Sequence, residues 1–583
     1  MKWFDTHHAT RPQGIERKHA HIVGGGIAGM AAAAFLIDDG YMDGRNITIY
    51  ENLPTVGGSM DGARNEHGYL CRGERELEPH MECLWYLFSK IPSIDSPGMT
   101  VLDETVAAQR DDQIYAHSRV LHRQGEVYEG IHDFTMSKRL TDKMIEMATT
   151  PEERFEDMTI DEFFGDTADE LYQSSMWICF HSMLAFKHYH SMIEFKRYVV
   201  RFMMYQPGAD RLVGITHTKY NEYDSMIKPL HAWLRERGVT FRTGCTVTDA
   251  DLNADHSRII ALRVRDERGE DTVSIDDDGL VIITNGSMTT NSAFGDNTHA
   301  TETNRGTEDM GAFTLWKRLA AKDANRFGHP EKFCSDIDKT KWVSVFPTVT
   351  GYPEFFRRVY ERYGYAPNTT TGAITVKDSS WDISMVFYPK YFPQQADDEQ
   401  VFWFDALYGE NEGDYIRKPA DQCTGEELLT ELLYHLGMLD MKDELLAHTY
   451  ISTCMMPYIT SQFMPRTIND RPRVIPEGSA NYAFIGQFCE LPGDVVFTVE
   501  TSIRTAMMAA YGLLDLDKPV VPLYEAQYDI RVLSMCLRKM LGKDAIDTED
   551  LPKINPLRMR EESRKLVDAF NAIPELDVMA HTY

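Results

Sequence analysis

The chain has 583 residues, of which 43% are hydrophobic and 26% charged, a composition typical of a folded protein with a large core. Its formal net charge of −30 at pH 7 disfavours nucleic acid as a partner. Residues 1–20 lack the apolar core of a signal peptide, and no apolar run is long enough to span a membrane. The nine cysteines contain no C-x-x-C pair, so we predict free thiols, no metal site and a cytoplasmic location with at most peripheral membrane contact.

The stretch from His19 to Gly62 predicts a dinucleotide-binding unit. A short apolar strand leads into Gly24-Gly25-Gly26-Ile27-Ala28-Gly29, a G-x-G-x-x-G, and an Ala-rich helix follows to about Asp38. Gly24 permits the tight turn, Gly26 lets a pyrophosphate approach the backbone, and Gly29 lets helix and strand pack closely. The start of the helix then offers its unpaired N–H groups to the phosphates.

The next strand, Ile47–Tyr50, ends on Glu51. A carboxylate about 20 residues after the last glycine is placed to accept hydrogen bonds from a ribose. A glycine-rich turn without a ligand would not need this acid. A second glycine turn, Gly57-Gly58-Ser59, follows at once and is more typical of FAD enzymes than of NAD dehydrogenases, so we predict FAD as the cofactor.

Three later segments are expected to return to the cofactor. Val247 lies on a strand in the usual place of the adenine contact, the strand Leu280–Ile283 opens into a small-residue turn, and a strand ending at Gly486 precedes a helix over Val496–Leu514. The predicted cofactor-binding residues are Gly24, Gly26, Ile27, Ala28, Gly29, Glu51, Gly58, Ser59, Arg75, Val247, Thr284, Asn285, Ser287, Gly486, Gln487 and Ser502.

Strands alternating with helices predict an α/β fold built on a discontinuous, Rossmann-like FAD-binding domain. Short strands are expected at Thr100–Leu102 and Ser118–Leu121, and aromatic-rich strands from Trp342 onward predict the sheet of an α+β substrate-binding domain. The expected division is 15–150, 210–295 and 470–515 for the FAD-binding domain, 151–209 and 296–469 for the substrate-binding domain, and 516–583 for a helical C-terminal region.

Two stretches invite a functional interpretation beside a plain structural one. The charged segment Arg72–Glu78 follows the second glycine turn, which places it near the flavin, although such a segment is usually a solvated loop. A helix at 190–203 carries Phe195, Tyr198, Val199 and Phe202 on one face. That face suits a core helix and equally the wall of an apolar ligand tunnel.

The C-terminal region contains a predicted helix at Tyr528–Leu541 and a second helical stretch at 556–572. A basic cluster is formed by Lys553, just before the second stretch, and by four residues within it, Arg558, Arg560, Arg564 and Lys565, which lie beside apolar residues. In a chain of net charge −30 such a helix either docks on a partner or core, or lies on an anionic membrane surface.

With these motifs in view, the chain resembles the fatty acid double-bond hydratases (oleate hydratases), also called myosin-cross-reactive antigens, over nearly its whole length. The resemblance rests on His21–Gly29, Arg72–Trp85, Thr216–Asn221, Thr284–Met288 and Met455–Arg466. It implies a bacterial FAD-dependent hydro-lyase that adds water to a cis double bond of an unsaturated C18 free fatty acid, oleate or linoleate. The product is a hydroxy fatty acid, there is no net redox change, and members are often homodimers.

The resemblance also implies residue roles. Glu76 activates the water, and Tyr198 protonates the alkene, with Tyr189 as the fallback. Apart from the resemblance, tyrosine is a weak acid that needs help from a neighbouring charge, and Arg201, one helical turn from Tyr198, is a candidate for that assistance. Tyr458 and Gln462 are the predicted substrate contacts.

This chain departs from the family in the charged loop, which in the family reads Arg-Gly-Gly-Arg-Glu-Met. Glu74 replaces the second glycine and Leu77 replaces the methionine, so loop motion, flavin affinity and substrate preference are in question. Two other functions stay open on the sequence alone: a flavin-dependent fatty acid isomerase or oxidoreductase, and a lipid-binding protein without activity. A product heavier by one water distinguishes hydration from redox chemistry.

Overall fold

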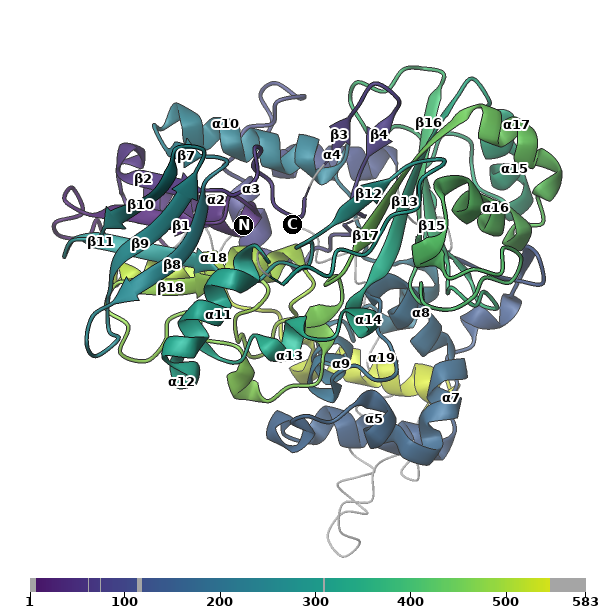
Figure 1. Ribbon diagram of the computed structural model, residues 1–583. Coiled ribbons are helices and arrows are strands. Elements are labelled where there is room, and N and C mark those ends of the chain that lie inside the picture. Colours follow the sequence, from purple (N-terminus) through teal and green to yellow (C-terminus); the bar gives the residue numbers. More distant parts are fainter. Residues whose placement is uncertain (1–6, 61, 74, 113–117, 308–309, 546–583) are drawn as a thin grey trace, which may run out of the picture.

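The computed structural model describes residues 7–60, 62–73, 75–112, 118–307 and 310–545. Figure 1 shows two sheets side by side with a helical layer beneath them. Strands and helices alternate through most of the chain, which confirms the predicted α/β fold. Among the described residues, no helix is both long and apolar enough to cross a membrane.

The first sheet is parallel throughout and is assembled from distant parts of the chain. Its order is β18 (Tyr482–Ile485), β11 (Gly279–Thr284), β1 (His19–Val23), β2 (Ile47–Tyr50) and β7 (Thr240–Arg242). Parallel neighbouring strands are joined by long crossover connections. Strands from distant segments of the chain can therefore lie side by side in this sheet. This topology supports the proposed discontinuity of the FAD-binding domain.

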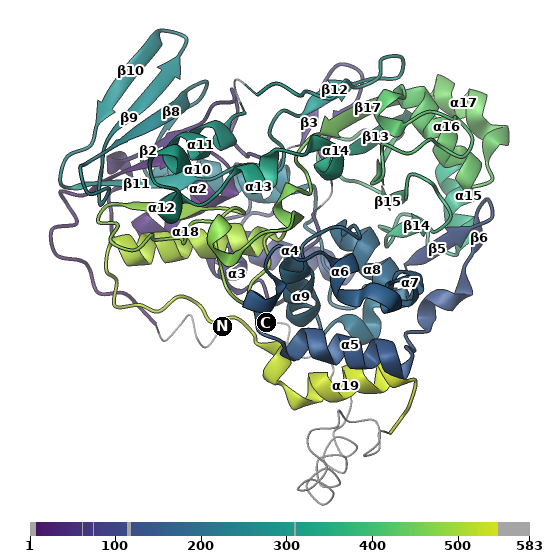
Figure 2. The same ribbon diagram turned by 60° about the horizontal axis from the view of Figure 1, so that its bottom comes forward.

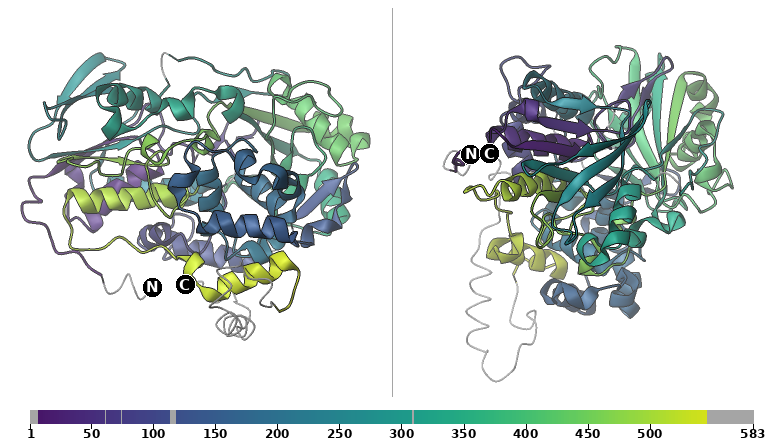
Figure 3. Two further views of the ribbon diagram at one scale, coloured as in Figure 1. Left: turned by 90° about the horizontal axis from the view of Figure 1, so that it is seen from below. Right: turned by 60° about the vertical axis from the view of Figure 1, so that its left-hand side comes forward.

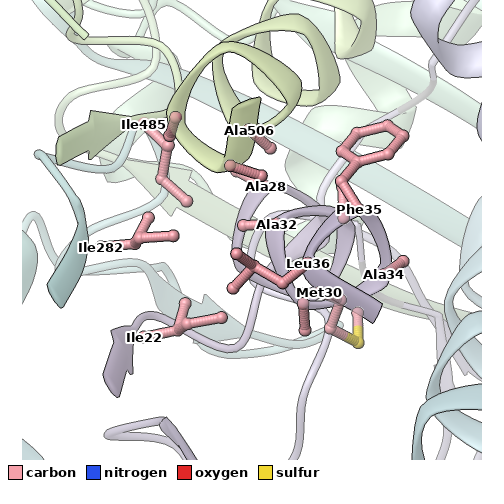
Figure 4. Packing of buried hydrophobic residues seen from close by; sticks show 14 of the residues in the cluster. Ile22, Ala28, Met30, Ala32, Ala34, Phe35, Leu36, Ile282, Ile485 and Ala506 are labelled. Carbon is pink, nitrogen blue, oxygen red and sulfur yellow. The ribbon is translucent and has the colours of Figure 1, made fainter. Parts of the chain in front are cut away.

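Helix α2 (Ile27–Asp38) is buried between this sheet and helix α18 (Val499–Leu513). Its run of alanines presents almost no side-chain bulk, so α18 approaches it closely. Figure 4 shows Ala28 and Ala32 on the side of Ala506 from α18, while Ile22, Ile282 and Ile485 cover the sheet side. A helix that is apolar all round is expected in such a sandwiched position.

A small antiparallel sheet lies beside the parallel one. It contains β8 (Thr246–Leu252), β9 (Ile259–Asp266) and β10 (Gly269–Ser274). Around the two sheets lie α3 (Glu82–Phe88), α4 (Val101–Asp111), α10 (Lys228–Glu236), α11 (Ala312–Lys322), α12 (Ala324–Phe327), α13 (Glu331–Cys334) and α14 (Ile337–Thr340).

The eight-stranded sheet forms the second half of the molecule. Its order is β12 (Ala293–Gly295), β17 (Thr449–Met456), β13 (Trp342–Thr350), β16 (Glu399–Ala406), β15 (Ser384–Tyr388), β14 (Ile374–Val376), β5 (Arg119–His122) and β6 (Glu126–Val127). Helices α15 (Glu354–Tyr363), α16 (Gly425–His435) and α17 (Lys442–Ala447) cover one face. A hairpin of β3 (Ala63–Arg64) and β4 (Tyr69–Leu70) lies against β13.

A helical layer lies below the sheets in Figure 2. It contains α5 (Lys138–Thr149), α6 (Ile160–Phe164), α7 (Ala168–Gln173), α8 (Ser175–Leu184) and α9 (Met192–Arg201), with α19 (Ile530–Leu541) packed along α5. Figure 3 shows the α5–α19 pair at the underside of the molecule. Helix α19 confirms the helix predicted at Tyr528–Leu541, whereas the predicted helix at 556–572 lies outside the described residues.

Two details of the predicted arrangement are wrong. Thr100–Leu102 opens helix α4 instead of forming a strand, because Thr100 caps the helix and Asp103 completes a capping box. Strands β5, β6 and β12, from segments assigned to the FAD-binding domain, join the eight-stranded sheet instead. Sheet membership depends on pairing between residues far apart in sequence, which a local pattern does not encode.

Candidate active site

The glycine turn after β1 is shaped by close backbone contacts. Gly24 has φ = 105°, a conformation that favours glycine. A Cβ on Gly29 would lie 2.0 Å from the Gly24 carbonyl oxygen, so only glycine lets α2 start directly against the strand. Gly26 caps α2 without a side-chain hydrogen bond, which leaves the N–H groups of the first turn, where Ile27 and Ala28 lie, available to a phosphate.

Glu51, the acidic residue at the end of β2, is hydrogen-bonded to the glycine turn. Its carboxylate accepts hydrogen bonds from the backbone N–H groups of Gly25 and Leu53, both at 2.8 Å. Burial raises the pKa of this carboxyl, although the two hydrogen bonds act in the opposite direction and lower it. Each oxygen keeps a second lone pair for a ribose hydroxyl, so the arrangement fits the role predicted from the spacing.

The second glycine turn lies against the first. The Gly57 N–H donates to the Gly25 carbonyl oxygen at 3.0 Å, and a Cβ on Gly58 would lie 3.0 Å from the Gly26 Cα. The Arg75 guanidinium donates to the Ser59 carbonyl oxygen at 3.0 Å. The charged loop is therefore anchored to the turn that the sequence places beside the cofactor, while Glu74 itself lies outside the described residues.

Other predicted cofactor residues gather at the carboxyl ends of β11 and β18. The Thr284 Oγ1 lies 2.7 Å from where a Gly24 Cβ would be, and Gly486 follows β18, the strand paired with β11. Asn285 is fully buried, and neither its amide nitrogen nor its amide oxygen has a hydrogen-bond partner among the described residues. A buried amide without partners is costly, so a bound group with donors and acceptors, as a flavin has, fits this position.

The remaining predicted cofactor contacts are scattered over neighbouring elements. Val247 is buried on β8 and Ser502 on α18, whereas Ser287 and Gln487 are half-buried in the turns after β11 and β18. Their contact with the cofactor stays a prediction.

A cavity that is partly open to solvent lies between the charged loop, the helical layer and the eight-stranded sheet. Its walls are mainly apolar and include Phe180, Leu184 and Phe202. Glu76 lines this cavity together with Arg75. A carboxylate in the wall of an apolar cavity is the kind of convergent polar group that marks a ligand site.

The charged loop is also held by hydrogen bonds of Leu77 and Glu78 to other segments. Leu77 and Thr216 exchange two backbone hydrogen bonds of 2.8 Å, which joins two motifs that are far apart in sequence. The Glu78 carboxylate accepts hydrogen bonds from Arg201 at 2.7 Å and from the Tyr205 hydroxyl at 2.6 Å. Arg201 is therefore an ion-pair partner of Glu78.

Tyr198 is fully buried on α9 and does not belong to the residues that line the cavity. Its hydroxyl oxygen accepts a hydrogen bond of 2.6 Å from the N–H of Phe497, which does line it. Burial and the charge of Glu194 raise the pKa of Tyr198 well above its usual value, and the cation that lowers this pKa is Arg471. The expected assistance from Arg201 is therefore wrong, because Arg201 pairs with Glu78.

The other predicted contacts lie apart from the cavity lining. The Tyr189 hydroxyl donates to the Lys339 carbonyl oxygen at 3.0 Å. Tyr458 and Gln462 are buried, and neither the Tyr458 hydroxyl nor the Gln462 amide has a hydrogen-bond partner among the described residues. As with Asn285, these unpaired groups fit a bound ligand.

Polar groups on the sheet side of the cavity were not predicted from the sequence. Trp342, Ser384 and Asp405 line it there, and the Trp342 indole N–H is buried with no partner among the described residues. Burial raises the pKa of Asp405 to about 8, and the negative charge of Asp382 raises it further. The hydrogen bond from the Ser384 N–H and the charge of His181 lower this pKa and only partly offset the effect of burial. In the sequence, Asp405 follows Phe402-Trp403-Phe404 in an expected strand, a pattern that does not distinguish it from an ordinary strand residue.

Comparison with known proteins identifies the family. The family model described as MCRA matches residues 17–511. The chain belongs to the MCRA family. This confirms the resemblance drawn from the motifs, because MCRA abbreviates the older name of the oleate hydratases.

The MCRA relatives cover almost the whole chain. It is 37% identical over 572 residues to the oleate hydratase of Streptococcus pyogenes serotype M49 (strain NZ131), covering 96% of both proteins. It is 31% identical over 536 residues to the linoleate hydratase of Lactiplantibacillus plantarum, covering 85% of this chain and 93% of that protein.

The fold of this chain is also similar to that of solved structures outside the MCRA family. The cyclohexylamine oxidase of Brevibacterium oxydans IH-35A matches with a TM-score of 0.50 at 11% identity, over 85% of this chain and 99% of that one. A variant of putrescine oxidase matches with the same TM-score at 12% identity and the same coverage. At this identity the likeness concerns the fold alone.

Proposed function

We propose that this protein is an FAD-dependent hydratase that adds water to a cis double bond of an unsaturated C18 fatty acid and releases a hydroxy fatty acid. The observation that carries the proposal is the position of Glu76 in the wall of a large apolar cavity, next to the paired glycine turns. Two relatives with these substrates in their names, aligned along most of the chain, support it.

The reaction requires a proton on one alkene carbon and a hydroxyl on the other. Glu76 takes a proton from the water as the hydroxyl adds, and its negative charge stabilises the cation that develops on the carbon. Tyr198 supplies the other proton. Because its hydroxyl already accepts the Phe497 N–H, its own proton is free to point elsewhere.

FAD is held by the glycine turns, Glu51 and Asn285. Hydration involves no net oxidation or reduction of the fatty acid, so bound FAD would supply shape and charge at the reaction site. Arg75, which contacts both the cavity and the Ser59 carbonyl, connects the cofactor end to Glu76.

The carboxyl end of the fatty acid binds at the sheet side of the cavity. The unpaired Trp342 N–H is a donor there, and Asp405, with its pKa raised to about 8 by burial, is protonated at neutral pH and donates a second hydrogen bond. A neutral carboxylic acid acting as a donor in an apolar site is physically sound. Tyr458 and Gln462 remain proposed substrate contacts.

The test is incubation with FAD and oleate or linoleate in heavy-oxygen water, followed by mass spectrometry of the product. One labelled hydroxyl on the chain is expected from the wild type. Glu76→Gln, which keeps the size of the side chain and removes its charge, is expected to bind the fatty acid and lower the rate by about 10²–10⁴-fold. A product altered only in its hydrogen count, or full activity in Glu76→Gln, would contradict the proposal.

The protein also works as a homodimer at an anionic membrane surface, where free fatty acids partition. The basic cluster at 553–565 supports the membrane contact, and the family resemblance supports the dimer. Light scattering on the purified protein measures the oligomeric state directly.

A further inference from the structure

A second cluster of ligand-type side chains lies on the opposite face of the eight-stranded sheet from the cavity. On β16, Trp403 and Asp405 face the cavity, whereas Phe402 and Phe404 belong to the core beneath α16. Here Asp414, Glu431 and His435 bring one ligand atom each to within 4.8 Å of one another. The cluster is therefore separate from the proposed hydratase site.

The three residues come from two elements. Glu431 and His435 lie one turn apart on α16, so their side chains share one side of the helix. Asp414 belongs to the loop between β16 and α16. Glu431 is fully buried and His435 is 3% exposed, while the Asp414 side chain is 29% exposed and gives solvent access to the cluster.

The His435 imidazole makes ion-pair contacts with both carboxylates. The His435 Nε2 lies 3.3 Å from the Asp414 Oδ2 and 3.3 Å from the Glu431 Oε1. It is buried and has no hydrogen-bond partner among the described residues. Without a cation, the ring and the two carboxylates form an ion-pair cluster.

The spacing suits a shared cation instead. Zn²⁺ binds imidazole nitrogen at about 2.0–2.1 Å and carboxylate oxygen at about 2.0–2.2 Å, in tetrahedral geometry. The edge of such a tetrahedron is about 3.3–3.5 Å long by simple geometry from these bond lengths. Both separations from the His435 Nε2 match this edge.

The carboxylates are held in place by outer hydrogen bonds. Glu431 accepts the backbone N–H groups of Asp414 at 2.6 Å, Tyr415 at 3.0 Å and Ile416 at 2.7 Å. The Ser380 hydroxyl donates to the Asp414 Oδ1 and the Ser380 N–H donates to the Asp414 Oδ2, both at 2.8 Å, and Oδ2 also lies beside His435. Such contacts orient metal ligands in known sites.

We propose that Asp414, Glu431 and His435 bind a divalent transition-metal ion, for which Zn²⁺ has the best-matched ligand set and spacing, with water as the fourth ligand. The ion clips the loop at 410–419 to α16 and has no part in hydration. No metal site was predicted from the sequence, because the cysteines form no C-x-x-C pair and a lone Glu-x-x-x-His on a helix is not distinctive.

The test uses the full-length protein, freed of metal with a chelator and titrated with Zn²⁺ by calorimetry. The wild type is expected to bind one Zn²⁺ per chain, and His435→Gln to bind it about 100-fold more weakly. The control is His448→Gln: His448 also lies one turn from a glutamate, Glu444, at 3.5 Å, but both are exposed. This variant is expected to bind Zn²⁺ as the wild type does.

Equal Zn²⁺ affinity of the wild type and His435→Gln would overturn the proposal. If His435→Gln does not fold, Co²⁺ substitution in the wild type decides. Visible absorption of tetrahedral Co²⁺ at one equivalent, together with a higher melting temperature, supports the site. Absence of that absorption overturns it and leaves the cluster as a metal-free ion pair.

Discussion

Replacing Asp405 by asparagine is expected to change how the stability of the protein depends on pH. Burial raises the pKa of this carboxyl in the folded protein from its ordinary 3.8 to about 8. Between these values the folded state holds one proton more than the unfolded state. Stability therefore falls as pH rises through this window, by about 1.4 kcal/mol per pH unit.

Asparagine has no proton to lose, so Asp405→Asn lacks this slope. From pH 5 to pH 8 the stability of the variant is expected to gain on that of the wild type by about 4 kcal/mol. Other titrating groups are common to both proteins and cancel in the difference. Because Asp405 is only 5% exposed, solvent screens its charge little, and the change in unfolding free energy keeps nearly its full size.

The assay is urea or thermal unfolding of both proteins without cofactor at pH 5, 6, 7 and 8 and constant ionic strength. Asp397→Asn, in the exposed turn before β16, is the matched control. Parallel profiles of the wild type and Asp405→Asn would refute the reasoning that burial keeps this carboxyl protonated. The proposed carboxyl anchor adds a kinetic expectation: the KM for the fatty acid rises above pH 8 in the wild type and not in Asp405→Asn.

Three further predictions concern the catalytic acid, the cofactor and the membrane. Tyr198→Phe is expected to lower kcat by about 10²–10⁴-fold with little change in fatty acid binding; an unchanged kcat would transfer the acid role to another group. Gly29→Ala is expected to lose FAD and melt earlier, since its Cβ would lie 2.0 Å from a carbonyl oxygen, whereas Gly26→Ala meets nothing nearer than 3.5 Å. Gly26→Ala should keep the melting temperature of the FAD-free protein and still bind FAD more weakly, as flavin absorbance after purification measures; full flavin content in both variants would count against the assignment. Deleting residues 550–583 is expected to abolish flotation with anionic vesicles, and undiminished flotation would exclude the basic cluster as the membrane contact.

The family was recognisable from its sequence motifs, and the start of the FAD-binding unit was predictable because it depends on local geometry. The turn at Gly24–Gly29 needs glycine for contacts only a few residues away, and the structure shows those contacts. The spacing to Glu51 likewise follows from one strand–helix–strand unit, and the structure joins Glu51 to that turn.

Other features depend on which distant segments meet, and no local pattern encodes that. The helical face around Tyr198 was readable, yet the packing of α9 determines that Tyr198 meets Phe497 and that Arg201 meets Glu78. Asp405 was indistinguishable from an ordinary strand residue until the sheet, the helical layer and the charged loop enclosed one cavity. Burial by residues far away in sequence gives that carboxyl its raised pKa, so only the tertiary structure could reveal it.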